Sequence, residues 1–420
     1  MLSRSVLSTL LGLESGTVHV GGVEFCDGEL LVALSPTGRF AQRCPVCDRR
    51  CSRYDAGRAR RWRALDFDRV RVFVCSRPPR IRCAEHGVLV AAVPWARPRA
   101  RHTRRFEQLA AWAAVEMSAS AASTLLRCAW RTIGVMVLRV AADLAVARGS
   151  DGLDGLHRIG IDEISYRRGR RYLTVVVDHD TRRLVWAKEG RSHPTTRAFF
   201  DALGPERTAA LTQISADSAR WIVEPVRERA PGALLCADPF HVVSWGLEAM
   251  DTVRLQVWKT IRAGLLRQPN GQPRKGQTRQ MDGARYALRR NPDSLTDTQR
   301  GRLEWIVAAH PDIASAYTQK ETLRALFKLS GDDSRAALDS WIATARNSGL
   351  NPFIDLADRL DRHRESIFNT LDSGLTNALV ESVNTKIRLI ARRGFGFRNT
   401  NALIALAQLS LGAQRPAIPT

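Results

Sequence analysis

The sequence predicts an α/β protein in which a mixed β-sheet with flanking helices is joined to a smaller β module and to further helices. Hydrophobic residues make up 44% of the 420-residue chain, so a sizeable core can form. Strand-like apolar runs fall in residues 1–95 and 157–241. Apolar spacings of three and four indicate helices between residues 103 and 148, and residues 242–370 also read as mainly helical.

The charge balance indicates a polyanionic partner. The chain has 64 Lys and Arg against 42 Asp and Glu, a formal net charge of +22. A basic surface gains free energy by displacing condensed counterions from phosphates. A membrane-surface binder and a soluble protein with a basic surface are the alternatives. No apolar run reaches the ~20 residues that span a bilayer, and the N-terminus lacks a signal-peptide pattern. We therefore expect a cytoplasmic, nucleoid-associated bacterial protein with no membrane partner.

Residues 1–95 are predicted to form a zinc-binding β module. Cys44-Pro-Val-Cys47 has the spacing of a zinc knuckle, and Cys83-Ala-Glu-His86 repeats that spacing. Two such pairs at the tips of hairpins can surround Zn²⁺ tetrahedrally, and cysteines stay reduced inside a cell. The predicted ligands of this structural zinc are Cys44, Cys47, Cys83 and His86. Cys51 and Cys75 are alternative ligands, and coincidental cysteines in a small β domain are the alternative interpretation.

Residues 96–150 are predicted to form a basic linker and a helix-turn-helix DNA-binding domain. No acidic residue occurs between Gly87 and Arg105, and Trp130-Arg131-Thr132 would open the recognition helix. A plain three-helix packing module has the same apolar stripes and is the alternative. The arginines expected to contact DNA here are Arg97, Arg99, Arg101, Arg127 and Arg131.

Residues 151–241 show an informative order of elements. The expected order is three strands, a helix, a strand, a helix and a strand, at His157–Ile164, Tyr172–Val177, Leu184–Lys188, Thr195–Leu203, Ala210–Ser215, Ala219–Arg229 and Ala233–Ala237. A three-stranded meander followed by alternating helices and strands is the order of an RNase H-like domain. We predict that this region is the first part of an RNase H-like catalytic core.

Acidic residues stand where strands of this domain end. Asp162 lies at the end of the first strand and Asp217 just past the fourth. These strands are neighbours in an RNase H-like sheet, so the two carboxylates would meet at one edge. Asp217 could instead cap the next helix, and Asp238, after the fifth strand, competes with it as the second catalytic acid. His241 could position a phosphate, transfer a proton or be a hydrogen-bonded core histidine.

Residues 242–370 are predicted to be a mainly helical insertion, interrupted by a polar basic segment at residues 268–280. Residues 371–420 are predicted to contain a final core helix, from about Asn377 to Arg392, and a basic C-terminal segment. The apolar stripe expected to pack on the sheet consists of Val380, Val383, Ile387 and Ile390.

The opposite face of this final helix is polar and contains Glu381 between Asn377 and Asn384. Glu381 can thus face the two aspartates, and Asn384 is a candidate supporting residue. The cations expected to lie along bound DNA are Lys386, Arg388, Arg392 and Arg393. A solvated basic helix end is the alternative.

Three converging carboxylates repel one another unless cations lie between them. We predict that Asp162, Asp217 and Glu381 hold two Mg²⁺ (or Mn²⁺) ions per active site. Hard oxygen ligands suit these ions, and two ions about 3.5–4 Å apart suit in-line phosphoryl transfer.

Together these motifs resemble the ISL3 family of insertion-sequence transposases. The resemblance covers nearly the whole chain and is most specific in Asp238-Pro-Phe-His241 and in Glu381–Phe397. It implies a zinc module, a helix-turn-helix and an RNase H-like domain with a helical insertion before the final Glu. The implied catalytic acids are Asp162, Asp217 and Glu381, and Asp238 and His241 match a Cys/Asp-x-x-His motif of related transposase groups. His86 departs from the family, because many relatives have Cys there.

The activity that the resemblance implies is cleavage at the inverted-repeat ends of a mobile element and joining of the 3′-hydroxyls to target DNA. We therefore expect a DNA transposase that acts as a homodimer or larger assembly, since two element ends must be brought together. A non-catalytic zinc and helix-turn-helix regulator is one alternative, but the presence of all three acids disfavours it. An RNase H-like nuclease without strand transfer is the other.

Overall fold

The structure of the protein is a computed structural model. It describes residues 9, 11–13, 16–167, 169–266, 283–329 and 331–419. Contacts divide the chain into two compact units, Met1–Gly152 with Ile387–Thr420, and Leu153–Lys386. Each unit is considered by itself. The basic segment at residues 268–280 lies outside the described residues. No helix in the described part of the chain has the length and apolar character of a membrane span.

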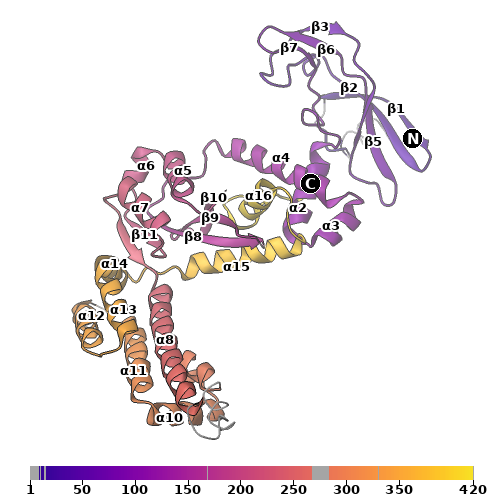
Figure 1. The fold of residues 1–420 in the computed structure, drawn as a ribbon. Coiled ribbons are helices and arrows are strands. Elements are labelled where there is room, and N and C mark those ends of the chain that lie inside the picture. The colour runs from indigo at the N-terminus through magenta and orange to yellow at the C-terminus, as the bar shows by residue number, and fades with distance from the viewer. Residues whose placement is uncertain are drawn as a thin grey trace. The chain divides into compact units, whose positions relative to one another are not determined.

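The first unit begins with two small sheets (Figure 1). The four-stranded sheet has the order β1-β2-β5-β4, formed by β1 (Val18–Cys26), β2 (Glu29–Pro36), β5 (Arg71–Ser76) and β4 (Arg60–Arg63). Its core contains fully buried Val32 and Val74 beside the edge-to-face pair Trp62 and Trp95. The three-stranded sheet has the order β3-β6-β7, formed by β3 (Ser52–Asp55), β6 (Arg80–Cys83) and β7 (Gly87–Val90).

Three helices follow, as the sequence predicts: α2 (Arg104–Glu116), α3 (Ala119–Leu126) and α4 (Trp130–Arg148). Thr103 and Ser118 cap the first two with their hydroxyls, which satisfies backbone N–H groups of each first turn. A fourth helix, α16 (Thr400–Leu411), packs on α4 and α2 through Ala405, Leu406 and Leu409. The sequence interpretation of a basic C-terminal segment was therefore incomplete, because an apolar helix ends this unit.

The second unit contains a five-stranded sheet with the order β10-β9-β8-β11-β12. Its strands are β8 (Arg158–Arg167), β9 (Arg171–Asp178), β10 (Arg183–Glu189), β11 (Gln213–Ala216) and β12 (Leu234–Ala237). The first three strands pair antiparallel, whereas β11 runs parallel to both β8 and β12. The predicted pairing of the first strand with the fourth is therefore confirmed.

Helices cover one face of this sheet. They are α5 (His193–Leu203) and α7 (Arg220–Arg229), and the short α6 (Pro205–Ala209) packs on α5. Phe199 of α5 and Ile222 of α7 are fully buried against Ile159 and Ile161 of β8. Because side chains alternate along a strand, Gly160 and Asp162 face the other side of the sheet.

A helical insertion follows β12, formed by α8 (Pro239–Leu266), η1 (Pro292–Ser294), α10 (Asp297–Ala309), α11 (Pro311–Leu326), α12 (Gly331–Arg346), α13 (Asn351–Arg362) and α14 (Arg364–Ser373). Helices α11 and α13 pack along α8 around a core that includes Met250, Leu323 and Phe353 (Figure 1). The predicted insertion is thus helical in its described residues.

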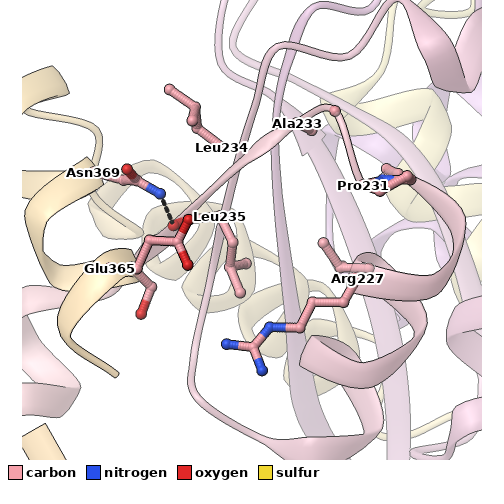
Figure 2. Close-up of a pocket in the computed structure, with 11 residues that line it drawn as sticks. Arg227, Pro231, Ala233, Leu234, Leu235, Glu365 and Asn369 are labelled. Carbon is pink, nitrogen blue, oxygen red and sulfur yellow. Dashed lines mark hydrogen bonds between the residues drawn. The ribbon is translucent and has the colours of Figure 1, made fainter. Parts of the chain in front are cut away.

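Helix α14 covers the edge of β12. Asn369 donates a hydrogen bond to the Leu235 carbonyl at 3.0 Å (Figure 2). Thr370 donates one to the Ala237 carbonyl at 2.7 Å. Capping of an edge strand in this way removes a template for unwanted strand pairing. A cavity of about 320 Å³ lies toward the start of β12, and Arg227 and Glu365 contribute to its lining (Figure 2).

Helix α15 (Ala378–Arg393) starts in the second unit and ends in the first. Its apolar stripe is buried, as expected, but it does not pack on the sheet along its full length. Val380 lies against Gly160 of β8, whereas Ile390 packs into the core of the helices of the first unit. The expectation that the whole stripe packs on the sheet is therefore wrong for Ile390.

Candidate active site and metal-binding clusters

Three carboxylates gather where β8 and β11 lie side by side. The pairing aligns Ala216 with Ile161, so the residues that follow them, Asp217 and Asp162, lie at neighbouring positions. Asp162, Glu163 and Asp217 offer ligand oxygens that all lie within 4.8 Å of one another. The two aspartates expected to meet therefore do meet, and Glu163 joins them.

Burial makes this acidic group costly in the ionised state. It raises the pKa of Asp162 to about 7, and the charges of Asp217 and Glu163 add to the rise. Burial is also the main cause of the raised pKa values of Glu163 and Asp217. A divalent cation would offset both the desolvation and the repulsion, and oxygen donors are the ligands that Mg²⁺ and Mn²⁺ prefer. The donor set therefore fits such an ion.

Helix α15 and the residue that precedes it contribute two asparagines that contact the sheet. Asn384, 2% exposed, donates a hydrogen bond from its Nδ2 to Asp162 Oδ2 at 2.8 Å. Asn377, fully buried, accepts one on its Oδ1 from the Ser215 hydroxyl at 2.5 Å. These contacts hold the first two turns of α15 against β8 and β11. The polar face predicted for this helix is thus turned to the sheet.

Gly160 permits this close approach of helix and strand. A Cβ atom at this position would lie 2.3 Å from Val380 Cγ2, and 2.9 Å from His179 Nε2. Real Cβ atoms do not come so near, so any side chain here would push α15 away from β8. The Gly-Ile-Asp-Glu stretch therefore combines a helix-packing residue with the acids themselves.

Glu381 lies on the same helix face, between Asn377 and Asn384 in sequence, and is half-buried. In the described part of the chain, the group with ligand oxygens inside 4.8 Å of one another is Asp162, Glu163 and Asp217. Glu381 is not one of its members. The third acid expected from sequence is therefore on the helix that covers the site, but not inside the tight group.

Asp238 and His241 form a pair beside the acids. Asp238, 3% exposed, lies 2.7 Å from His241 Nδ1 and accepts a longer hydrogen bond, 3.4 Å, from the Asn377 backbone N–H. The hydrogen bond to Asp238 raises the pKa of His241 to about 9, and the charges of Asp217 and Asp162 contribute. His241 is thus a cation held near the cluster. Asp217, and not Asp238, is in the three-acid group.

The four predicted zinc ligands lie together in the first unit. Cys44, Cys47, Cys83 and His86 have ligand atoms within 4.8 Å of one another. Cys47 Sγ lies 3.7 Å from Cys83 Sγ, which agrees with the roughly 3.8 Å that tetrahedral Zn–S bonds of about 2.3 Å require. The hydrogen bond to His86 lowers the pKa of the Cys83 thiol to about 6, which favours the thiolate that binds metal.

Local geometry explains why these four residues converge. Arg43 and Arg50 pair across the loop that contains Cys44 and Cys47. Cys83 pairs with Gly87 at the β6–β7 hairpin, whose turn contains His86. Each ligand pair is therefore at a hairpin tip. The alternative ligands Cys51 and Cys75 are outside the group, so the cluster can bind one metal ion with four protein ligands.

The arginines expected to contact DNA fall into two groups. Arg97 is 7% exposed and its guanidinium forms ion pairs with fully buried Glu107 and with Asp143. Arg127 pairs with Asp66 and also donates to the Arg69 carbonyl. Both guanidinium groups are thus committed within the unit. In the described part of the chain, no ion pair involves Arg99, Arg101, Arg131, Lys386, Arg388, Arg392 or Arg393.

Sequence reasoning missed the surroundings of Glu163. Trp221 Nε1 donates a hydrogen bond to Glu163 Oε2 at 3.1 Å, and Arg191 Nε lies 3.1 Å from Glu163 Oε1. Strand alternation assigned Asp162 to one face of β8, which gave no reason to group Glu163 with it. The adjacency of the two acids was the only signal that could have indicated it. The expectation that Asp162 lies at a strand end is wrong, because β8 continues to Arg167 and only β11 ends beside it.

Comparisons with known proteins agree across the whole chain. A family model described as a transposase, of the ISL3 DDE type, matches residues 159–407, and a helix-turn-helix domain of transposase family ISL3 matches residues 91–141. The chain is 46% identical over 437 residues to the transposase for insertion sequence element IS1557 of Mycobacterium tuberculosis, which covers 100% of this chain and 98% of the relative. It is 28% identical over 403 residues to the transposase for insertion sequence element IS1001 of Bordetella parapertussis, with 95% and 96% covered.

Proposed function

Because the chain belongs to the ISL3 family of insertion-sequence transposases and is a DNA-transposing enzyme of the DDE type, we propose that it binds the terminal inverted repeats of its element and cuts and joins DNA at the acidic cluster. The observation that carries this proposal is the convergence of Asp162 and Asp217 under helix α15. A non-catalytic regulator is not favoured, because it would have no use for a buried acidic group.

We assign the central sheet to the RNase H-like class. The order β10-β9-β8-β11-β12, with three antiparallel strands followed by two parallel ones, supports this assignment. Helices α5 and α7 on one face and α15 on the other complete the layers. The helical insertion from α8 to α14 separates the last sheet strand from α15, as the ISL3 resemblance implies.

Asp162 and Asp217 would hold the divalent ions, with Glu381 as the third acid from the covering helix. Mg²⁺ or Mn²⁺ supplies activation of the attacking hydroxyl and stabilisation of the leaving oxygen in phosphoryl transfer. Glu381 shares its helix face with Asn384, whose amide contacts Asp162, and this supports its role.

The residues around the acids have separate tasks in this proposal. Asn384 fixes the orientation of the Asp162 carboxylate through its 2.8 Å hydrogen bond. Asp238 holds His241 in the charged form, and the imidazolium can pair with a phosphate oxygen of the bound strand. Asp238 is therefore a positioning residue, and Asp217 is the second metal-binding acid.

DNA binding is implied by the helix-turn-helix and transposase domains. We propose that α4 is the recognition helix and that exposed Arg131 in its first turn reaches the DNA, together with Arg99 and Arg101 of the preceding linker. Arg97 and Arg127 do not belong to this set, because Arg97 pairs with Glu107 and Asp143, and Arg127 pairs with Asp66. Zinc at the cysteine cluster would stabilise the β module that precedes them. Synapsis of two element ends would require a homodimer or larger assembly.

The test is cleavage of a duplex that contains one element end, in Mg²⁺ or Mn²⁺, by the Asp162→Asn variant. We expect loss of both cleaved and joined products on denaturing gels, with binding of the end retained in a mobility-shift assay. Asp201→Asn is the matched control, because Asp201 is an exposed acid on α5 whose ion pair with Arg229 is remote from the cluster. Normal cleavage by Asp162→Asn would show that the site is assigned wrongly.

A further inference from the structure

The carboxylate of Glu163 lies in the same group as those of Asp162 and Asp217, although its donor Trp221 is on the side of β8 opposite to Asn384. We propose that Glu163 is a working ligand of the divalent-cation site and that Trp221 and Arg191 position it for that task. This inference rests on the proposed function, since it assigns a ligand of the same metal site.

Two donors fix the two oxygens of Glu163. Trp221 Nε1 donates to Oε2 and Arg191 Nε pairs with Oε1, each at 3.1 Å. The Arg191 guanidinium is itself stacked, with its carbon 4.1 Å from the Trp221 ring centroid and 4.9 Å from that of Tyr172. The Thr196 hydroxyl donates to the Trp221 carbonyl at 2.8 Å. Both donors are thus held by contacts of their own, and together they contact both oxygens of the Glu163 carboxylate.

An ion pair with Arg191 alone does not account for this arrangement. Two cations, the Arg191 guanidinium and the His241 imidazolium, act on three carboxylates whose oxygens lie within 4.8 Å of one another, and His241 is already paired with Asp238. Each carboxylate oxygen has about two acceptor sites, and each donor to Glu163 uses one of them. The Glu163 side chain is only 12% exposed, so water cannot easily screen the repulsion from Asp162 and Asp217. Further positive charge is needed at this point, and Glu163 has lone pairs left to bind it.

Asn384 gives an independent indication of a ligand at the same place. Its side chain is 2% exposed and its Nδ2 is fixed on Asp162. Its Oδ1 is buried and has no hydrogen-bond partner in the described part of the chain. A buried carbonyl oxygen without a partner costs free energy, and hard divalent cations readily accept amide oxygens as ligands. This oxygen therefore marks a position for a cation next to Asp162.

The consequence is a cation site with ligands from both faces of one strand. Asp162 and Asn384 approach from the side of α15, whereas Glu163 approaches from the side of α7. Such a site connects the two helix layers to the middle of β8. Loss of Glu163 should therefore weaken binding of the cation without removing the aspartates.

The experiment is a titration of the zinc-saturated, full-length protein with Mn²⁺, in which electron paramagnetic resonance measures the remaining unbound ion. Outer partners of metal ligands typically change affinity 10–100-fold. We expect Trp221→Phe, which removes the N–H donor but keeps an aromatic ring, to weaken Mn²⁺ binding roughly 10-fold. Glu163→Gln should weaken it by about 100-fold or more. Glu224→Gln, on an exposed ion-paired acid of α7, is the matched control and should bind Mn²⁺ like the unaltered protein.

Two results separate this inference from the function on which it rests. If Glu163→Gln keeps unaltered Mn²⁺ affinity while Asp162→Asn loses it, Glu163 is only a partner of Arg191, and the inference is overturned while the transposase site stands. If Asp162→Asn also binds Mn²⁺ normally, the metal site itself is misplaced.

A second variant covers the case in which Glu163→Gln does not fold, as judged by circular dichroism. Glu163→Asp keeps the charge but withdraws the carboxylate by one methylene, so it should retain the fold and still weaken Mn²⁺ binding. Unaltered affinity in that variant would overturn the inference in the same way.

Discussion

The cysteine cluster of the first unit and the acidic cluster of the second unit are built in opposite ways. The cysteine cluster takes its ligands from two hairpin tips within 43 residues of sequence, from Cys44 to His86. The acidic cluster takes Asp162 and Asp217 from two strands, and the asparagine on Asp162 comes from 222 positions away. Four protein ligands complete a structural zinc site, whereas a cluster of carboxylates leaves positions for substrate. The first arrangement suits folding and the second suits chemistry.

The largest effect should follow removal of zinc ligands. Replacing Cys44 and Cys47 together by Ser should abolish zinc binding and unfold β3, β6 and β7, since structural zinc contributes on the order of 10 kcal/mol in small modules. Zinc content and hydrogen exchange of these strands are the measurements. Cys26→Ser, on an exposed cysteine outside the cluster, should change neither. If the double variant keeps its full zinc content, Cys44 and Cys47 are not zinc ligands, and the assignment of the cysteine cluster as a structural zinc site is wrong.

The next largest effect, on both stability and DNA cleavage, is expected from a substitution at Gly160, where α15 packs against β8. Gly160→Ala places a Cβ against Val380 and should cost about 1–3 kcal/mol of unfolding free energy, as overpacked cores do. It should also separate Asn384 from Asp162 and so reduce DNA cleavage. Urea denaturation and the cleavage assay are the measurements. Gly232→Ala, where a Cβ meets nothing within 4 Å, is the control. Unchanged stability and cleavage would mean that α15 is not held tightly on the sheet.

In the absence of divalent cations, the acidic cluster should make the stability of the protein depend on pH. Because burial raises the pKa of Asp162 to about 7 from 3.8, its protonated form is favoured in the folded state. Its contribution to the free energy of unfolding is fully present below about pH 4 and is lost as the pH rises through about 7. The thermal unfolding midpoint should therefore fall across this range, and Mg²⁺ should reverse the fall. Asp162→Asn should flatten the profile; an equally steep profile in that variant would contradict this assignment.

The smallest expected effect concerns His241. Its pKa is raised to about 9 from 6.5 by the hydrogen bond to Asp238, so its contribution to stability is present below about pH 6.5 and is lost as the pH rises through about 9. In Asp238→Asn the pKa of His241 should move back toward 6.5, as followed by NMR titration of its ring. An unchanged pKa would mean that Asp238 does not hold the imidazolium beside the acids.

The sequence predicted those parts of the fold and sites that depend on local spacing or on the order of elements. The cysteine spacings identified all four members of the cluster, because each pair lies within one turn. The order of strands indicated that Asp162 and Asp217 would be neighbours, and β8 does pair with β11. Both inferences needed only short-range patterns and a known rule of sheet topology.

The features that the sequence did not predict depend on side-chain conformation and on contacts between residues far apart in sequence. The Glu163 carboxylate lies beside the aspartates in the middle of β8, which simple strand alternation does not predict. Arg97 was expected to contact DNA, but Glu107 and Asp143 pair with it only once α2 and α4 have packed. Helix α16 was not expected, because the prediction for this region rested on its charges, whereas the helix is stabilised by packing of its apolar residues on α2 and α4.

Anomalous diffraction from crystals grown with Mn²⁺ tests most directly whether the acidic cluster is the metal-dependent active site. The account predicts a peak within roughly 2.5 Å of carboxylate oxygens of both Asp162 and Asp217, since bound divalent ions of this size lie at about that distance or less. A peak elsewhere on the chain, with none at these two aspartates, would contradict it.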